Sequence, residues 1–306
     1  MLIEESAWGE LNEFDELMGA VRPEYSRNQV DAAGKMLVRD DVPVTALFEP
    51  WHILNNWRAS HSYPLNLIQG HLRRQARAVD SVAIVSQRLK RLESIERKLS
   101  RLPTLQMSQM QDIGGCRAVV ASVPSIYEVM RRLTTSRSKH VIKTPRDYIA
   151  FPKPDGYRGV HIVYQFTGSG DAAVFNKHRV EVQLRSQAQH VWATAVEAVG
   201  TMVGQDLKSG VGDKRWLRFF SLMSSAIALI ERQPGVEGTP KSARELRDEI
   251  IDLNDDLLAQ ATVQAYSAVW DDNEIEGAYY YLIHLKPDSR TLEVRHYKRR
   301  DVHLAN

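Results

Sequence analysis

Two neighbouring stretches of the chain, YRGVHIVYQF (157–166) and HRVEVQLRS (178–186), alternate with the two-residue period of a β-strand. The apolar positions of the first stretch are Val160, Ile162, Tyr164 and Phe166. Those of the second are Val180, Val182 and Leu184, and its polar positions are Glu181, Gln183 and Arg185. Each stretch therefore offers one face to a core, and the polar face belongs either to a half-exposed sheet or to a strand that lines a polar cleft.

Strands and a helix are also predicted just before these stretches. CRAVVAS (116–122) is predominantly apolar, as in a buried strand, and HVIKT (140–144) predicts a short strand. Between them, VPSIYEVMRRL (123–133) has helical spacing, with a proline near its first turn. We expect an α+β fold, in which helices surround a mixed, largely antiparallel sheet of about five strands.

The flanking segments are predicted to be mostly helical. Residues 1–79 form an N-terminal helical region, interrupted before Pro64, and residues 80–101 predict one amphipathic helix. Helical patterns also dominate 188–231 and 242–270, and the chain ends in a predicted hairpin with strands at 278–285 and 291–297. We expect three regions, namely 1–79, a core at 80–232, and a C-terminal helix and hairpin extension at 233–306.

Composition excludes several classes of protein. Of the 306 residues 43% are hydrophobic and 25% are charged, as in a globular rather than a disordered chain. The longest nearly apolar run, at 219–230, holds three serines and is shorter than the roughly 20 residues that cross a bilayer. The single cysteine, Cys116, excludes an internal disulfide framework and a cysteine-rich zinc site. We expect a cytoplasmic protein with no membrane contact.

The net charge of +2 conceals an uneven distribution. Residues 71–101 hold nine lysines and arginines against three acids, and residues 131–161 hold eight against two, so each block has a net charge of +6. Residues 241–260 hold three basic residues against six acids, a net charge of −3. The basic blocks indicate a site for a polyanion such as a nucleotide or nucleic acid, or two solvated helix faces.

Two sets of residues suggest phosphate and metal chemistry. On a single helix over 80–101, Lys90, Ser94 and Lys98 would follow one another at four-residue spacing and form a ridge that suits a row of phosphates. The alternative is an ordinary basic surface. Asp112 and Glu181 have the carboxylates that can hold Mg²⁺, or they are surface acids.

A third set lies in the loop TPRDYIAFPKPDGYRGVH (144–161). Its basic residues are Arg146, Lys153 and Arg158, and its aromatic residues are Tyr148, Phe151 and Tyr157. Aromatic rings stack on bases and cations hold phosphates, so this density predicts a nucleotide-binding loop rather than a structural turn.

Taken in order, these sets have a recognisable arrangement. Arg-x-Lys-x3-Ser-Ile-x2-Lys begins at Arg88, Asp-Ile-x-Gly-x-Arg at Asp112, and Asp-Tyr-Ile-x2-Pro-Lys-x2-Gly-Tyr-Arg-x2-His at Asp147, followed by Val-Glu-Val-Gln-Leu-Arg-Ser and Trp-Ala. The stretch from about 84 to 197 resembles the synthetase domain of the RelA/SpoT family. The resemblance implies a nucleotidyltransferase-like fold and an ATP-dependent pyrophosphokinase that transfers pyrophosphate to the 3′-hydroxyl of GDP or GTP with Mg²⁺.

The resemblance also implies a role for each motif residue. Those on the ATP side are Arg88, Lys90, Ser94, Lys98 and Arg117. Asp112 and Glu181 would bind Mg²⁺, and Glu181 would activate the acceptor hydroxyl. Those on the phosphate and acceptor side are Arg146, Lys153, Tyr157, His161, Gln183 and Arg185, with Tyr157 stacked on the acceptor base.

The sequence departs from the family at three places on the acceptor side. His190 stands where several members have Asn, Val196 and Glu197 stand where they have Glu-His, and no Tyr-Lys pair follows. A hydrolase domain with a His-Asp motif is not expected. Three hypotheses remain: an alarmone synthetase, a toxin-like relative that pyrophosphorylates the 3′ end of tRNA, and an inactive nucleotide-binding module. The C-terminal extension is predicted as a homo-oligomer interface, an autoinhibitory element or a packing appendage.

Overall fold

The computed structural model describes residues 19–259 and two later strands, 279–286 and 291–298. Its contacts divide the chain into two compact units. The first unit comprises Met1–Asp147 and Gly159–Ser186, and the second comprises Tyr148–Arg158 and Gln187–Asn306. The three regions expected from the sequence are a different division of the chain and stay a prediction.

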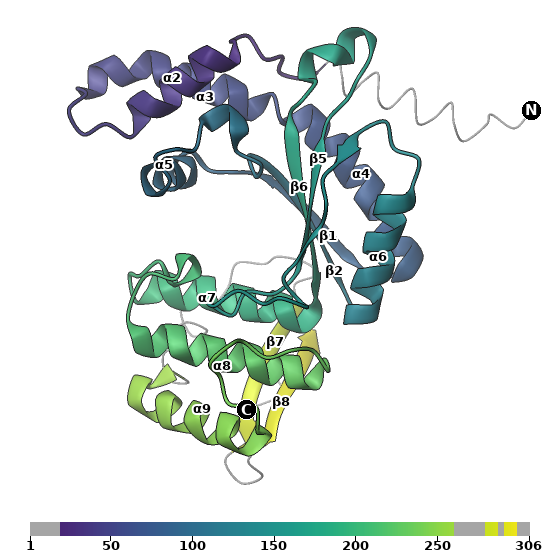
Figure 1. The fold of residues 1–306 in the computed structure, drawn as a ribbon, viewed down its shortest axis with the longest axis vertical. Helices are drawn as coiled ribbons and strands as arrows, with labels where there is room; N and C mark the ends of the chain where they lie inside the picture. Colours follow the sequence, from purple (N-terminus) through teal and green to yellow (C-terminus); the bar gives the residue numbers. More distant parts are fainter. Residues whose placement is uncertain (1–18, 260–278, 287–290, 299–306) are drawn as a thin grey trace, which may run out of the picture. The chain divides into compact units, whose positions relative to one another are not determined.

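A six-stranded sheet forms the centre of the first unit (Figure 1). Its strands are β1 (Ile84–Leu89), β2 (Gly114–Val120), β3 (Val141–Ile142), β4 (Arg146–Asp147), β5 (Val160–Gln165) and β6 (Arg179–Ser186). Their order is β1-β2-β6-β5-β3, with β4 also paired to β5. Only β2 and β6 run parallel, which confirms the mixed, largely antiparallel sheet and the α+β class.

One face of this sheet is apolar because the alternating strands turn their aliphatic residues to the same side. Val180, Val182 and Leu184 are at most 1% exposed. The helices α4 (Ser62–Val79) and α6 (Val123–Thr135) contact this sheet, and Figure 1 shows both on one side of it, with α5 (Leu92–Arg101) on the other. The remaining face of the sheet is free to carry polar residues.

The single helix predicted over 80–101 is wrong. Ile84–Leu89 is instead the edge strand β1, paired antiparallel with β2, and only Leu92–Arg101 is helical. The sequence around Val82 to Val85 is rich in β-branched residues, and pairing with β2 supplies backbone hydrogen bonds that outweigh a weak helix propensity. The apolar Ile95 and Leu99 on α5 are buried as the periodicity predicted.

The N-terminal helices are confirmed for the described residues. They are α2 (Arg27–Leu37), η1 (Val44–Leu47) and α3 (Phe48–Ala59), and Ser26 closes a capping box at the start of α2. They pack with α5 and η2 (Met107–Gln109) around a core that includes Leu54 and Ile113. A further turn, η3 (Gly170–Phe175), lies between β5 and β6.

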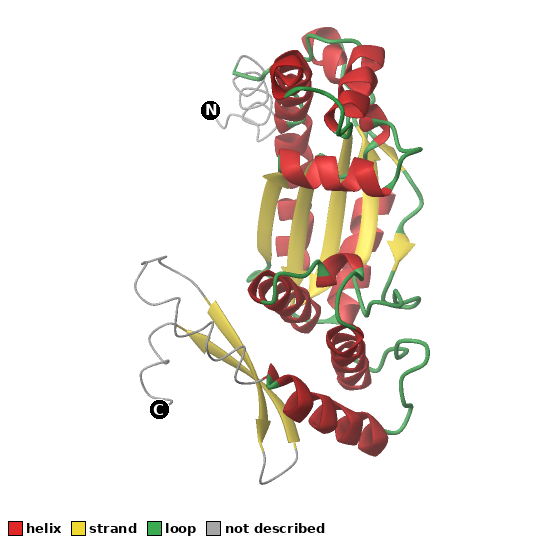
Figure 2. Ribbon diagram, turned by 90° about the vertical axis from the view of Figure 1, so that its left-hand side faces the viewer, coloured by secondary structure: helices red, strands yellow, loops and turns green. Residues whose placement is uncertain are grey.

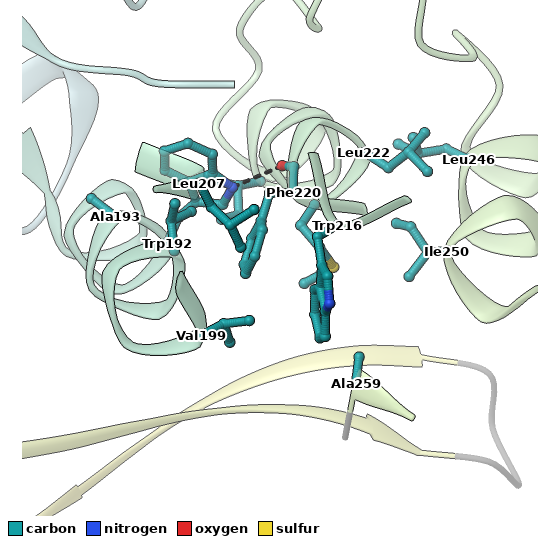
Figure 3. Close-up of a cluster of buried hydrophobic side chains, with 13 residues drawn as sticks. Trp192, Ala193, Val199, Leu207, Trp216, Phe220, Leu222, Leu246, Ile250 and Ala259 are labelled. Carbon is teal, nitrogen blue, oxygen red and sulfur yellow. Dashed lines mark hydrogen bonds between the residues drawn. The ribbon is translucent and has the colours of Figure 1, made fainter. Parts of the chain in front are cut away.

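The second unit is helical around an aromatic core (Figure 3). Its helices are α7 (Gln187–Met202), η4 (Leu207–Ser209), α8 (Lys214–Ile230) and α9 (Ala243–Leu257). Trp192 on α7 donates its indole N–H to the carbonyl of Phe220 at 2.8 Å, and Trp216 stacks on Phe220. Most of the 219–230 run is therefore core, as its apolar character predicted, but Leu229 and Ile230 at its end are exposed.

The predicted hairpin is present as β7 (Tyr279–Lys286) and β8 (Thr291–Lys298), paired antiparallel (Figure 2). The predicted helix over 242–270 is confirmed for Ala243–Leu257, and its part beyond residue 259 lies outside the described residues. Across the described segments, every helix is too short or too polar to traverse a lipid bilayer.

Candidate active site

The polar face of the first-unit sheet gathers most of the predicted site residues. Side chains at paired strand positions project from the same face. Gln183 on β6 is paired with Arg117 on β2 and with His161 on β5. The predicted site residues that this register assigns to one face are Arg88, Arg117, Arg146, His161, Glu181, Gln183 and Arg185.

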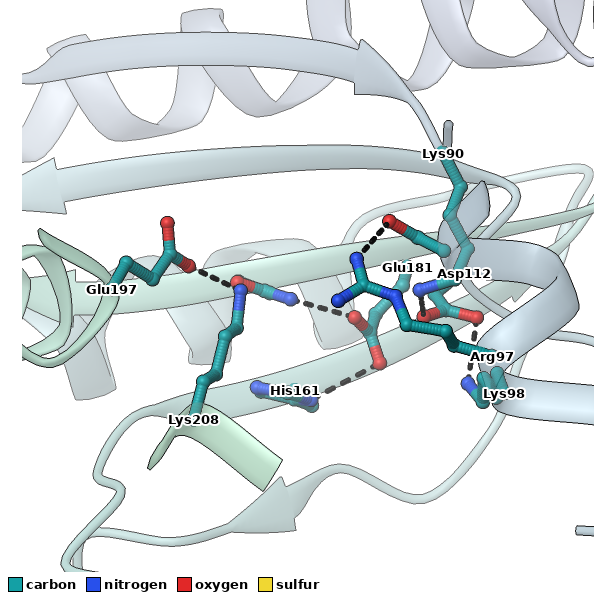
Figure 4. Close-up of polar contacts among 10 residues, drawn as sticks. Lys90, Arg97, Lys98, Asp112, His161, Glu181, Glu197 and Lys208 are labelled. Atoms are coloured by element: carbon teal, nitrogen blue, oxygen red, sulfur yellow. Dashed lines mark hydrogen bonds and ion pairs between the residues drawn. The ribbon is translucent and has the colours of Figure 1, made fainter. Parts of the chain in front are cut away.

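Asp112, just before β2, is held between two lysines (Figure 4). Lys90 Nζ lies 2.9 Å from Asp112 Oδ2, and Lys98 Nζ lies 2.8 Å from Asp112 Oδ1. Burial opposes ionisation of this carboxyl, but the two lysine charges outweigh it and lower the pKa of Asp112. Burial also lowers the pKa of Lys90, and the charge of Asp112 partly offsets that effect.

The predicted ridge of Lys90, Ser94 and Lys98 does not exist as a single helix face. Lys90 lies in the link after β1, while Ser94 and Lys98 lie on α5. The Lys90 N–H donates to the Ile113 carbonyl at 2.8 Å, which continues the β1–β2 pairing to the residue beside Asp112. Tertiary structure thus brings both lysines to one carboxylate that the helical spacing could not have indicated.

Glu181 is the centre of a second polar chain on the same face. His161 Nδ1 lies 3.1 Å from Glu181 Oε1, and Gln183 Nε2 donates to Glu181 Oε2 at 2.7 Å. Arg185 in turn donates to Gln183 Oε1 at 3.1 Å. Because an ionised carboxylate only accepts hydrogen bonds, Nδ1 of His161 carries the proton in this contact.

The ionisation of Glu181 follows from these contacts. Burial raises its pKa, but the hydrogen bonds and charge from His161 and the bond from Gln183 overcome burial and lower the pKa. The charge of Asp112 acts in the opposite direction, as expected for two carboxylates of one site. Glu181 is therefore an oriented, ionised carboxylate at neutral pH.

The pair Asp112 and Glu181 suits a magnesium ion. Mg²⁺ is commonly held by one or two carboxylates, with water and substrate phosphates as the other ligands. No cluster of three or more His, Cys, Asp or Glu side chains within the described segments could hold a metal. Each Asp112 oxygen accepts one lysine bond and keeps a further lone pair. The donor set therefore fits an ion whose remaining ligands are water or phosphate oxygens.

The first unit has a cavity of about 440 Å³, and His161 of the hydrogen-bonded series described above is among its lining residues. Its lining residues are Gln111, Ile142, Lys143, Thr144, Arg146, His161 and Val163. Sequence reasoning named Arg146 and His161 but missed Gln111 and Lys143. The position of Gln111 next to Asp112 was the signal available for it. Two cations and a histidine make this cavity suitable for phosphate groups.

The loop Tyr148–Arg158, here called the acceptor loop, belongs to the second unit. Lys153 Nζ lies over the rings of Tyr148 and Tyr157, 4.6 Å and 5.0 Å from their centroids. These contacts place a cation over two aromatic faces. Arg158 was expected among the phosphate-binding cations, but it is only 2% exposed. That interpretation of Arg158 is wrong.

Three of the positions that depart from the RelA/SpoT pattern lie on α7 of the second unit. They are His190, Val196 and Glu197, and Glu197 forms an ion pair with Lys208. The carboxylate of Glu197 therefore has a partner on the surface of the second unit, and both side chains are about half exposed. The geometry of this pair gives Glu197 a local electrostatic role in the second unit.

Comparison with known proteins shows what this chain resembles. Residues 87–200 match the family model described as the region found in RelA / SpoT proteins. The chain is 28% identical to GTP pyrophosphokinase YwaC of Bacillus subtilis over 158 residues, which are 50% of this chain and 70% of the relative. It is 29% identical to GTP pyrophosphokinase YjbM of the same organism over 168 residues, 53% of this chain and 75% of the relative.

The solved structures that resemble the chain include small alarmone synthetase 1 from Bacillus subtilis bound to its product pppGpp. That structure is 24% identical to this chain, covers 57% of this chain and 93% of its own, and has a TM-score of 0.47.

Proposed function

We propose that this chain, whose residues 87–200 belong to the RelA/SpoT synthetase family, is a pyrophosphokinase that makes (p)ppGpp from ATP and GDP or GTP. Relatives that cover half of the chain are named GTP pyrophosphokinase. The observation that carries the proposal is the shared polar face, on which a lysine-clamped Asp112 and an oriented Glu181 are both ionised.

On the ATP side, positively charged side chains come from several elements of the first unit. Lys90 and Lys98 are only 11% and 26% exposed, so their charges are weakly screened and act strongly on a phosphate. Arg88 and Ser94 extend this surface from β1 and α5, and Arg117 adds a guanidinium from β2. Transfer of a phosphoryl-type group depends on positioning and charge neutralisation, which these residues supply.

Glu181 would act as the base. The acceptor 3′-oxygen forms a bond to the β-phosphorus of ATP, the bond from that phosphorus to the oxygen of the α-phosphate breaks, and AMP leaves. The 3′-hydroxyl proton passes to the Glu181 carboxylate, which its pKa keeps ionised for that purpose. His161 and Gln183 hold the two carboxylate oxygens in place. Mg²⁺ held by Asp112 and Glu181 would add charge neutralisation at the phosphates.

The acceptor would be read by two features. Tyr157 offers an aromatic face to the guanine base, with Lys153 beside it. The cavity at Arg146 and His161 offers cationic groups to the acceptor phosphates. The altered positions His190 and Glu197 leave the tRNA 3′ end as the acceptor that competes with free GDP or GTP.

The test is a transfer assay on the purified chain. It is incubated with γ-labelled ATP and Mg²⁺, with GDP, GTP and bulk tRNA offered in parallel. Label in a guanosine tetra- or pentaphosphate supports the proposal. Label on tRNA alone replaces it with the toxin-like activity, and no label on any acceptor leaves the inactive nucleotide-binding module.

A further inference from the structure

Arg158, at the end of the acceptor loop, is buried and carries three hydrogen bonds. Its Nε donates to Ser224 Oγ at 2.9 Å, its Nη2 to the Pro234 carbonyl at 2.7 Å, and its Nη1 to the Ile149 carbonyl at 3.3 Å. Each bond ends on the loop itself or on the segments behind it, α8 and the stretch after it. The guanidinium thus joins the two ends of the loop to their support.

All three acceptors of Arg158 are neutral. Burial lowers the pKa of Arg158, and the charge of Glu231 opposes that shift. A buried guanidinium whose hydrogen bonds end on uncharged oxygens is costly to a fold, and an apolar side chain of similar size would pack at less cost. The residue therefore contributes directed bonds rather than packing.

Serines of α8 complete the support. Ser224 Oγ accepts from Arg158 and donates to the Gly156 carbonyl at 2.6 Å, and Ser221 Oγ donates to the Pro154 carbonyl at 3.2 Å. Two of the three serines in the 219–230 run are thus aimed at the acceptor loop, which explains polar groups within an apolar helix face.

The backbone of the loop is seated closely on these helices. Gly156 has φ +89, and a Cβ at this position would lie 2.8 Å from the Trp192 ring and 3.2 Å from the Phe220 carbonyl. Only glycine accepts both the positive φ and the close approach. The next residue is Tyr157, whose N–H donates to Asp155 at 2.8 Å. Any loosening at Gly156 or Arg158 therefore moves Tyr157 directly.

We propose that Arg158 is a positioning residue, which holds the acceptor loop against Ser224 and Pro234 so that Tyr157 and Lys153 are presented to the acceptor nucleotide. The inference rests on the proposed function for the identity of the ligand, a guanosine diphosphate or triphosphate. A guanidinium suits this role because its planar donors point in fixed directions toward three separate acceptors, which a lysine cannot reach together.

The experiment measures GDP binding and transfer for R158Q, S224A and S225A in the full chain. S225A is the matched control, because Ser225 is also buried on α8 but bonds Val236 N and Thr239 instead of the loop. We expect R158Q to weaken GDP binding and raise the KM for GDP roughly tenfold, with the KM for ATP within about twofold of the parent. S224A should show a smaller rise of the same kind, and S225A should show none.

The outcomes separate this inference from the proposed function. GDP binding that weakens in R158Q and S224A supports the inference, even where no transfer is detected and the proposed function fails. Equal GDP affinity in the parent, R158Q and S224A overturns the inference. If these proteins still transfer pyrophosphate, the proposed function stands. Equal losses in S224A and S225A, or no GDP binding by the parent, also overturn the inference. S224A keeps the test decisive where R158Q lowers the folded yield.

Discussion

The lysines beside Asp112 and the arginine at the end of the acceptor loop are held in opposite ways. In the first unit, Lys90 and Lys98 both contact the carboxylate of Asp112 and remain partly exposed. In the second unit, Arg158 is almost fully buried and bonds two carbonyls and a hydroxyl. A flexible ammonium beside a carboxylate can turn to an incoming phosphate, whereas a guanidinium bonded on every side by neutral backbone cannot.

This contrast suggests separate roles for the two sets of residues. We expect the charges on the polar face of the first-unit sheet to act in the chemistry, and the charge behind the acceptor loop to hold the loop in place. Variants on the sheet should change kcat or its pH dependence, and variants behind the loop should change acceptor binding or stability. The predictions below test that division, beginning with the largest expected effect.

E181Q should have the largest effect. It preserves the shape of the side chain but removes the ionised carboxylate, so transfer should fall about 10³-fold, the ordinary contribution of a general base. ATP binding, measured by calorimetry, should change little, because the lysines and arginines of the ATP side are untouched. Loss of ATP binding with unchanged transfer per bound nucleotide would contradict the role given to Glu181.

D112N should reduce transfer by about 10 to 100-fold, because a neutral amide holds neither the lysines nor a divalent ion as a carboxylate does. The Mg²⁺ concentration needed for half-maximal activity should rise. D31N is the matched control, since Asp31 accepts two bonds from Ser108 in the helical core and none from the lysines. An unchanged magnesium dependence in D112N argues against the metal pair.

H161A should shift the pH profile. His161 lowers the pKa of Glu181 below its ordinary value of 4.5, so its removal raises that pKa. A base works only when ionised, so the acid limb of the kcat profile should move to higher pH.

The free energy of unfolding should also depend on this group. The stability that an ionised Glu181 contributes is present above its unfolded pKa and is lost as pH falls through the lower folded pKa. H140A, a partly buried histidine that bonds Thr167, should leave the limb in place.

W192F should have the smallest effect. It removes the indole bond to the Phe220 carbonyl inside the second unit, a loss of about 1 kcal/mol of unfolding free energy. The measurement is a urea denaturation curve. Because Trp192 also lies against Gly156, a small rise in the KM for GDP should accompany the loss, and kcat should hold. A fall in kcat with no change in the free energy of unfolding would contradict the separate roles of the sheet residues and the residues behind the acceptor loop.

Local patterns in the sequence predicted much of the fold. The alternation in β5 and β6 is a property of neighbouring residues, so it predicted which side chains share the polar face without knowledge of the partner strands. The helices α6 to α9 and the β7–β8 hairpin follow from equally local spacing. The order of the motifs predicted the resemblance to the RelA/SpoT family for the same reason, because each motif is a continuous stretch of the chain.

Tertiary structure alone decided the features that depend on distant partners. Residues 84–89 form a strand because they pair with β2. Lys90 and Lys98 both contact Asp112 because Lys90 continues that pairing while Lys98 lies on α5. Arg158 became a buried support because its acceptors lie on residues 149, 224 and 234, which are far apart in sequence. The periodicity of the sequence predicts which face of a strand or helix a residue lies on, but only tertiary packing determines which charged side chains it contacts.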